Sequence, residues 1–150
     1  MSDEQPQPTY LEGTSADWLR LVDSGDPVER RLAVYALGEI GRPDSETVTA
    51  LRERLEDPMS FVRVWAAAAL RRIEPRSEEA LATLVAATRD EQHFVRSLAA
   101  WMLARTTSEA AEEVIETLTG MLDDRDASVR AEATAAIERL QRLERGVPTS

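Results

Sequence analysis

The chain offers few side chains that are placed for catalysis or for binding a metal. Its single histidine, His93, stands in the segment Asp90-Glu-Gln-His-Phe-Val, with no nucleophile in a shared motif. One histidine does not supply the three or four ligands of a zinc site, and a general base needs a group to act on. Because the chain has no cysteine, thiolate metal sites and disulfides are excluded. His93 is therefore interpreted as a turn residue rather than a catalytic base.

Adjacent carboxylates are the other groups that could carry acid–base chemistry. The pairs are Glu78-Glu79, Glu112-Glu113 and Asp123-Asp124. Each lies in or beside an expected helix end, where acids cap the helix or favour the positive end of its dipole. A phosphate loop is excluded because Gly38-Glu39-Ile40-Gly41 lacks both the spacing and a preceding strand. We predict no catalytic residue, no cofactor and no metal site, and so no enzyme.

All 18 basic residues are arginine, and they face 28 aspartates and glutamates, which gives a formal net charge of −10. Two interpretations of the missing lysine are open, the codon usage of a GC-rich genome and adaptation to high salt. A strongly acidic chain is a poor general binder of nucleic acid, because phosphate neutralisation dominates that affinity. Anionic lipid surfaces repel it as well. Nucleic acid and membrane surfaces are therefore not the expected partners.

One arginine returns at a nearly constant interval, as Arg30, Arg63, Arg96 and Arg130, with spacings of 33, 33 and 34 residues. An alanine follows each of them three residues later. Six and seven residues later stand the pairs Ala36-Leu37, Ala69-Leu70, Met102-Leu103 and Ala136-Ile137. A fixed period of about 20–50 residues is the signature of a solenoid.

Apolar residues at spacings of three and four place a helix before each arginine and a second helix around it. The predicted helices span about 15–23, 28–40, 46–56, 59–73, 78–89, 92–105, 109–122 and 126–144. Asp26-Pro27 and Asp57-Pro58 are expected to start second helices, and Ser45, Ser77 and Ser108 to cap first helices. We predict an all-α, right-handed α-solenoid of four helical hairpins, at about 14–41, 45–74, 77–106 and 108–145.

Both ends of the chain differ from the periodic part. Residues 1–13 are acidic and polar, and we expect a disordered arm there, with a flexible tail at 146–150. The acidic start lacks the apolar run of a signal peptide. No segment approaches the roughly 20 apolar residues of a membrane span. A cytoplasmic location is the resulting expectation, and the oligomeric state stays open.

The segment Asp57-Pro-Met-Ser-Phe-Val-Arg63-Val-Trp-Ala-Ala-Ala-Ala-Leu70 closely resembles a HEAT repeat. Over about residues 14–144 the chain is similar to the short prokaryotic HEAT-like repeats of phycobilisome lyase subunits. This resemblance implies a scaffold that binds proteins, with a bilin lyase-type accessory or catalytic subunit as the alternative. Deoxyhypusine hydroxylase binds iron through repeated His-Glu pairs, which this sequence lacks. HEAT-like DNA glycosylases use tryptophans and an aspartate on a basic concave face, where this chain has Glu39 and Glu138 instead.

The recurring arginine has two possible roles, a structural ion pair or an anion site. Its presence in every repeat favours structure, with each arginine bonded to the aspartate six residues earlier or to the equivalent aspartate of a neighbouring repeat. The predicted ladder comprises Asp57, Arg63, Asp90, Arg96, Asp124 and Arg130.

The exposed face of the second helices is unusually rich in aromatic and arginine side chains, which are the residues enriched at binding hot spots. The predicted partner-binding residues are Tyr35, Val64, Trp65, Ala68, Arg71, Arg72, Trp101, Arg105 and Arg139. We predict that this concave face binds an acidic and aromatic segment of another protein, opposite an acidic back formed by the first helices. Packing of the tryptophans between repeats is the alternative, and nucleic-acid binding through the arginines is less favoured by the charge.

Overall fold

The chain folds into helical hairpins stacked along one axis. A computed structural model describes residues 13–105 and 110–146. The first helices of the hairpins are α1 (Ser15–Leu21), α3 (Ser45–Arg54), α5 (Glu78–Ala87) and α7 (Ala111–Gly120). The second helices are α2 (Pro27–Ile40), α4 (Ser60–Ile73), α6 (His93–Leu103) and α8 (Ala127–Glu144), with a 3₁₀ turn η2 (Met121–Asp123) before α8.

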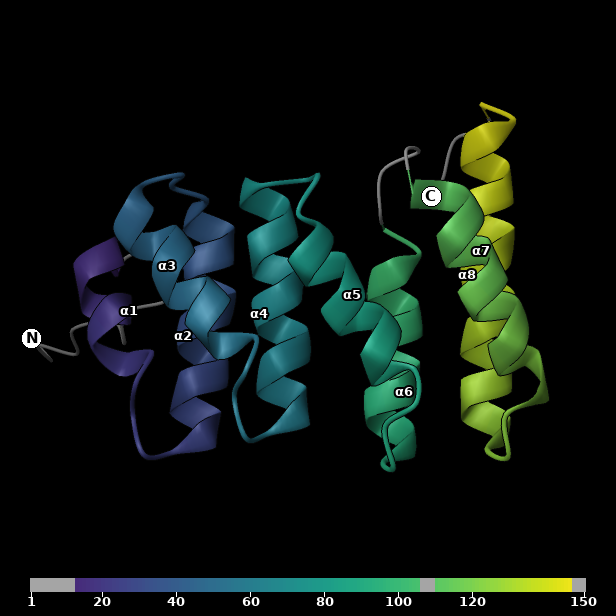
Figure 1. The fold of residues 1–150 in the computed structure, drawn as a ribbon, viewed down its shortest axis with the longest axis horizontal. Helices are drawn as coiled ribbons and strands as arrows, with labels where there is room; N and C mark the ends of the chain where they lie inside the picture. Colours follow the sequence, from purple (N-terminus) through teal and green to yellow (C-terminus); the bar gives the residue numbers. More distant parts are fainter. Residues whose placement is uncertain (1–12, 106–109, 147–150) are drawn as a thin grey trace, which may run out of the picture.

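Figure 1 shows these helices as two layers, with α1, α3, α5 and α7 in one and α2, α4, α6 and α8 in the other. The predicted all-α solenoid is confirmed. Apart from Gly13 and Gly146, the arm and the tail expected from the sequence lie outside the described residues, as does Ser108. None of the helices within 13–105 and 110–146 is long and apolar enough to cross a bilayer.

Short polar side chains begin most of the helices. Asp26 accepts the N–H of Val28 at 2.9 Å and precedes Pro27, as the sequence predicts. Ser77 caps α5 by accepting the N–H of Ala80 at 3.3 Å. At α3 the cap is Asp44 rather than Ser45, because the Asp44 carboxylate accepts the N–H of Thr47 at 2.9 Å.

The core lies between the two layers and follows the period of the sequence. Ala33, Ala66, Ala99 and Ala133, three residues after the recurring arginines, are all completely buried. Val62, Val95 and Val129, one residue before an arginine, are buried to the same degree. Small side chains at these positions allow the helices to approach closely, and branched ones fill the space between layers.

Candidate functional site

The recurring arginine connects successive repeats. Arg30 on α2 donates through Nε to Asp57 Oδ2 at 2.8 Å and through Nη2 to Asp57 Oδ1 at 3.2 Å. Its Nη1 donates to the carbonyl oxygen of Ser24 at 2.8 Å. Burial raises the pKa of Asp57, but hydrogen bonds from Arg30 and from the Met59 N–H outweigh burial and leave that pKa below its ordinary value. A buried bidentate ion pair therefore ties the first repeat to the second.

The same arrangement joins the third repeat to the fourth. Arg96 on α6 donates through Nε to Asp124 Oδ2 at 2.9 Å and through Nη2 to Asp124 Oδ1 at 3.0 Å. Its Nη1 donates to the carbonyl oxygens of Asp90 and Glu91. The hydrogen bonds from Arg96 hold the pKa of Asp124 below its ordinary value.

The ion pair predicted between repeats two and three does not form among the described side chains. Arg63 Nη1 donates to the backbone carbonyl of Asp57 at 2.6 Å, and Arg130 Nη1 donates to that of Asp124 at 2.7 Å. The aspartate six residues earlier thus contributes its carbonyl, because its carboxylate faces the preceding repeat. Among the described side chains, no ion pair joins Arg63 to Asp90. This corrects the prediction of one continuous ladder: two junctions carry the pair, and the junction between repeats two and three does not.

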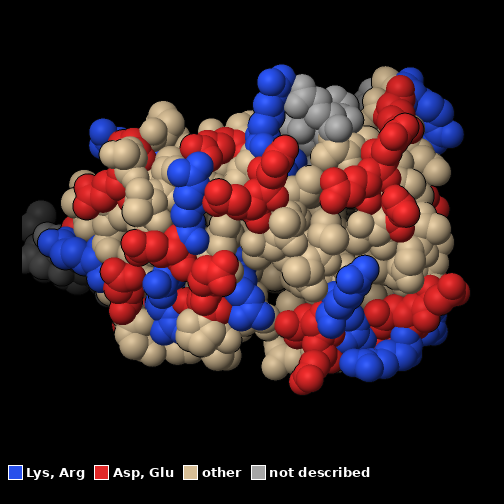
Figure 2. Space-filling view, viewed as in Figure 1, with Lys and Arg blue, Asp and Glu red and all other residues tan. Residues whose placement is uncertain are grey.

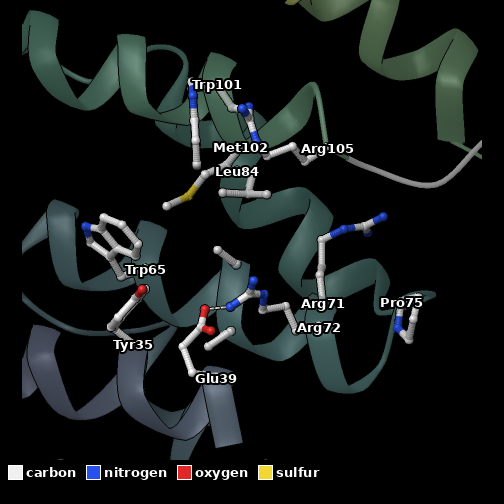
Figure 3. A pocket seen from close by; sticks show the side chains of 13 residues that line it. Tyr35, Glu39, Trp65, Arg71, Arg72, Pro75, Leu84, Trp101, Met102 and Arg105 are labelled. Atoms are coloured by element: carbon white, nitrogen blue, oxygen red, sulfur yellow. Dashed lines mark hydrogen bonds and ion pairs between the residues drawn. The ribbon is translucent and has the colours of Figure 1, made fainter. Parts of the chain in front are cut away.

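A cavity of about 590 Å³ opens at this unpaired junction, on the side of the second helices. Figure 3 shows Tyr35 and Glu39 from α2, Trp65 and Arg72 from α4, and Trp101, Met102 and Arg105 from the α6 side facing the same space. Figure 1 shows α5 running obliquely between α4 and α6, and Leu84 of α5 forms part of the cavity wall. The cavity is therefore a product of how repeats two and three meet.

Aromatic rings form two sides of the cavity. Tyr35 and Trp65 pack edge to face, with ring centroids 5.5 Å apart. The Arg31 guanidinium lies 5.8 Å from the centre of the Trp65 ring. Across the cavity, Trp101 is 41% exposed, and the Arg105 guanidinium lies 3.4 Å from the centre of its ring. An apolar side chain entering between these tryptophans would contact ring surface on two sides.

Arginines surround the cavity and differ in how their charges are balanced. Arg72 forms an ion pair with Glu39. Arg71 donates to the Ser77 carbonyl at 3.3 Å and Arg105 to the Trp101 carbonyl at 2.6 Å, and neither bonds a carboxylate within the described ranges. Burial lowers the pKa of Arg71. Burial and the nearby charge of Arg139 together lower the pKa of Arg105. Two partly desolvated cations therefore stand beside an apolar wall, and neither has a carboxylate hydrogen-bond partner among residues 13–105 and 110–146.

The structure brings together most of the partner-binding residues that the sequence predicts. Those that line the cavity are Tyr35, Trp65, Ala68, Arg71, Arg72, Trp101 and Arg105. Val64 is completely buried in the core and offers no surface, so it is removed from the set. Arg139 does not line the cavity and acts on it through the field at Arg105.

The cavity wall also contains residues that are absent from the predicted set, namely Gly38, Glu39, Ala69, Pro75, Leu84 and Met102. Leu84 lies on a first helix, whereas the predicted binding face comprises the second helices alone. Met102 stands six residues after Arg96, where the other repeats have Ala36, Ala69 and Ala136. Methionine in place of alanine at this position is a sequence signal that the third repeat packs differently from the others.

The layer of first helices is not uniformly acidic. Figure 2 shows acidic and basic side chains interspersed over this face. Arg52, for example, lies 3.0 Å from Glu74 and 3.5 Å from Glu79. The acidic back expected from the sequence is therefore partly neutralised by arginines.

His93, the single histidine, does not line the cavity. His93 is exposed at the start of α6, and its Nδ1 lies 3.8 Å from Asp126 Oδ2. In the described part of the chain, no cluster of three or more histidines and carboxylates is arranged to hold a metal ion. The arrangement at the cavity is suited to recognition, through ring surface and guanidinium donors.

Comparison with known proteins supports the fold. HEAT repeats match the chain over residues 16–104 and 74–138. The chain belongs to the HEAT-repeat family. A crystal structure of an engineered protein from the Northeast Structural Genomics Consortium is similar, with 25% sequence identity and a TM-score of 0.58. The match covers 84% of this HEAT-repeat chain and only 62% of the engineered one. No curated protein matches the sequence.

Proposed function

We propose that this HEAT-repeat protein is a non-catalytic scaffold that docks a protein or peptide on its α2–α4–α6 face. The docked segment places a large apolar or aromatic side chain between Trp65 and Trp101. Acidic side chains next to that anchor pair with Arg71 and Arg105. HEAT-repeat folds commonly mediate protein interactions, which agrees with this role.

The observation that carries the proposal is that Arg71 and Arg105 line the cavity and, among the described residues, hydrogen-bond only backbone carbonyls. Burial lowers the pKa of Arg71, and burial with the charge of Arg139 lowers the pKa of Arg105 against the opposing charge of Glu132. Within the described ranges, neither guanidinium hydrogen-bonds a carboxylate. A partly desolvated guanidinium gains most from a carboxylate that binds it through two parallel hydrogen bonds. The neighbouring rings supply the apolar contact that makes such pairs specific. An acidic segment with an aromatic anchor satisfies both requirements at once.

The size of the cavity limits how the partner binds. A volume of about 590 Å³ accommodates a few side chains and not a folded domain. The partner therefore inserts anchor residues from a helix or an extended segment that lies across the second helices. Contacts of this kind give modest affinity from a small buried area.

The alternatives receive less support. Nucleic-acid binding would have to overcome a formal net charge of −10. A bilin lyase-type role depends on the narrower resemblance to phycobilisome lyase repeats, whereas the family match is to HEAT repeats in general. We therefore propose docking alone.

A selection from a random peptide-display library tests the proposal, because it lets the protein choose its own ligand. The native protein is expected to enrich peptides that combine an aromatic residue with two or more carboxylates. Trp101→Ala and Arg105→Gln should abolish the enrichment, whereas Arg89→Gln, which removes an exposed arginine outside the cavity, should retain it. Enrichment of basic peptides, or equal enrichment by all four proteins, would reject the docking groove.

A further inference from the structure

We call a junction closed where the arginine–aspartate pair forms, as between repeats one and two and between repeats three and four, and open where it does not, as between repeats two and three. The open junction still contains an arginine and an aspartate that are held as their counterparts are in the closed junctions. Arg63 Nη1 donates to the Asp57 carbonyl, as Arg30 Nη1 donates to the Ser24 carbonyl in the closed first junction. Asp90 Oδ1 accepts the N–H of Gln92 at 2.9 Å, as Asp57 Oδ1 accepts that of Met59. Arg63 and Asp90 therefore keep the local hydrogen bonds of a paired arginine and aspartate, but they are not close enough to each other to form the ion pair.

The space between these two residues is a second hollow, on the side of the molecule away from the tryptophans. Arg63 and Asp90 both line this hollow, together with Leu55 of repeat two and Ala86 of repeat three. Hollows thus flank this junction on both faces: α4 and α6 make little contact with each other, while α5 packs against α4.

Two positions on the facing second helices explain the separation. Eight residues after the recurring arginine, α2 has Gly38, and a Cβ added there would lie 2.7 Å from the Ala69 Cβ on α4. The corresponding residues at the third junction are Ala104 and Ala136, which are 1% and 2% exposed. Both closed junctions therefore have only glycine or alanine at these two positions.

At the open junction the same two positions hold Arg71 and Met102. Both side chains line the cavity; in Figure 3, Met102 lies beside Leu84, and Arg71 extends from α4 with its guanidinium pointing away from Met102. An arginine and a methionine cannot occupy the volume of a glycine and an alanine, since protein interiors have no spare space of that size. The helices must stand further apart here than at the other junctions.

We propose that Arg71 and Met102 act as a wedge that keeps repeats two and three apart, and that this wedge creates the cavity. Arg63 and Asp90 form a latch that stays open as long as the wedge is in place. Removal of the wedge brings the repeats together, forms the Arg63–Asp90 pair and eliminates the space between Trp65 and Trp101. The inference rests on the proposed function only in treating the cavity as a docking site.

The wedge also gives the cavity its chemistry. Arg71 is one of the two arginines of the cavity wall that hydrogen-bond no carboxylate among the described residues, and Met102 lies beside Trp101 in the same wall. A flexible thioether adapts to differently shaped apolar anchors. The residues that separate the repeats thus also contact the docked segment. Closure of the latch and occupation of the cavity exclude each other.

Thermal denaturation of Asp90→Asn and Asp124→Asn variants in two backgrounds tests the latch without any ligand. In the native chain, Asp90→Asn should change Tm very little, because Arg63 is not its partner. In the Arg71→Ala/Met102→Ala background, the same change should lower Tm by at least about 5 °C, as expected for loss of a buried ion pair in a chain of this size. Asp124→Asn, which breaks an existing pair, provides the reference value in both backgrounds.

Distance measurement provides a second readout. Because the chain has no cysteine, Pro58→Cys and Glu91→Cys place two spin labels on exposed positions on either side of the junction. The distance between labels should shorten when Arg71 and Met102 are replaced by alanine. If the double variant does not fold, Met102→Ala alone should give a smaller shortening in the same direction.

The results separate this inference from the proposed function. An unchanged label distance together with the same small Asp90→Asn effect in both backgrounds would overturn the wedge. A shortened distance with failed peptide enrichment would leave the wedge standing and reject docking. Enrichment by the native chain that is lost in the Arg71→Ala/Met102→Ala variant, with the distance shortened, would support both.

Discussion

The first and second junctions of this solenoid have an arginine and an aspartate at equivalent positions, yet the ion pair forms at the first junction and not at the second. Between repeats one and two, Arg30 and Asp57 form a buried bidentate pair and the helices approach closely at Gly38. Between repeats two and three, Arg63 and Asp90 are apart and a cavity lies on the other face. The repeated ion pair therefore does not set the spacing of the helices. The size of the residues at the crossing point does so, and the pair forms only where that spacing allows it.

The largest expected contrast is between two equivalent aspartates. Asp57→Ala should lower the free energy of unfolding by about 3–5 kcal/mol, because it leaves the buried Arg30 guanidinium without its partner. Asp90→Ala should cost only about 1 kcal/mol, the loss of its hydrogen bond to the Gln92 N–H. Both aspartates accept an N–H two residues later, so Asp90→Ala is a matched control for that bond. Chemical denaturation measures both; equal losses would remove the contrast.

Acid should reduce the contribution of a closed junction. The folded-state pKa of Asp124 lies below its ordinary value, chiefly because of the hydrogen bonds from Arg96. A carboxylate with a depressed folded pKa stabilises the fold above its unfolded pKa of about 3.9, and this stability is lost as pH falls through the folded pKa.

The difference in unfolding free energy between the native chain and Asp124→Asn should thus be constant above about pH 5 and shrink below about pH 4. Urea titrations at several pH values measure it. A difference that grows on acidification would contradict the assigned sign.

A methyl group at Gly38 should weaken a closed junction. Gly38→Ala should cost about 1–3 kcal/mol, because the new Cβ would lie 2.7 Å from the Ala69 Cβ and 2.8 Å from its Cα, and backbone cannot move aside as a side chain can. Gly120→Ala is the control, since nothing lies within 4 Å of a Cβ there, and it should stabilise α7 by up to about 1 kcal/mol. Loss of stability in both variants would show that crowding at Ala69 is not the cause.

The smallest expected effect on stability is at the open junction. Trp101→Ala should change the unfolding free energy by no more than about 1 kcal/mol, because the ring is 41% exposed and borders a cavity. The same change should weaken binding of a selected acidic-aromatic peptide at least about tenfold, as expected of a hot-spot residue. Fluorescence anisotropy with a labelled peptide measures the affinity. A large stability loss with unchanged affinity would make Trp101 a packing residue.

The fold could be predicted from local patterns because every repeat buries small and branched apolar side chains at the same positions. Alanine three residues after each arginine and valine one residue before Arg63, Arg96 and Arg130 fix which face is buried, whatever the neighbours are. Local patterns determine helix ends less closely. The cap of α3 is Asp44 and not Ser45. Either side chain is able to accept an N–H of the first turn, so the backbone geometry decides between them.

The sequence predicted many of the residues that line the candidate site, but it did not predict why a cavity forms there. The helical period placed Tyr35, Trp65 and Trp101 on one face, and the structure gathers them around one cavity. It also placed Val64 there, although Val64 is completely buried, because one helix face does not reveal where the next helix packs.

The sequence by itself determined the period, the helical hairpins, the buried stripe and the presence of an arginine and an aspartate at every junction. Only the tertiary structure decided which of these pairs form. An ion pair requires contact within a few ångströms, and the distance between repeats is set by residues on two different helices at once. Gly38 against Ala69 brings one pair together, and Arg71 against Met102 keeps the next pair apart.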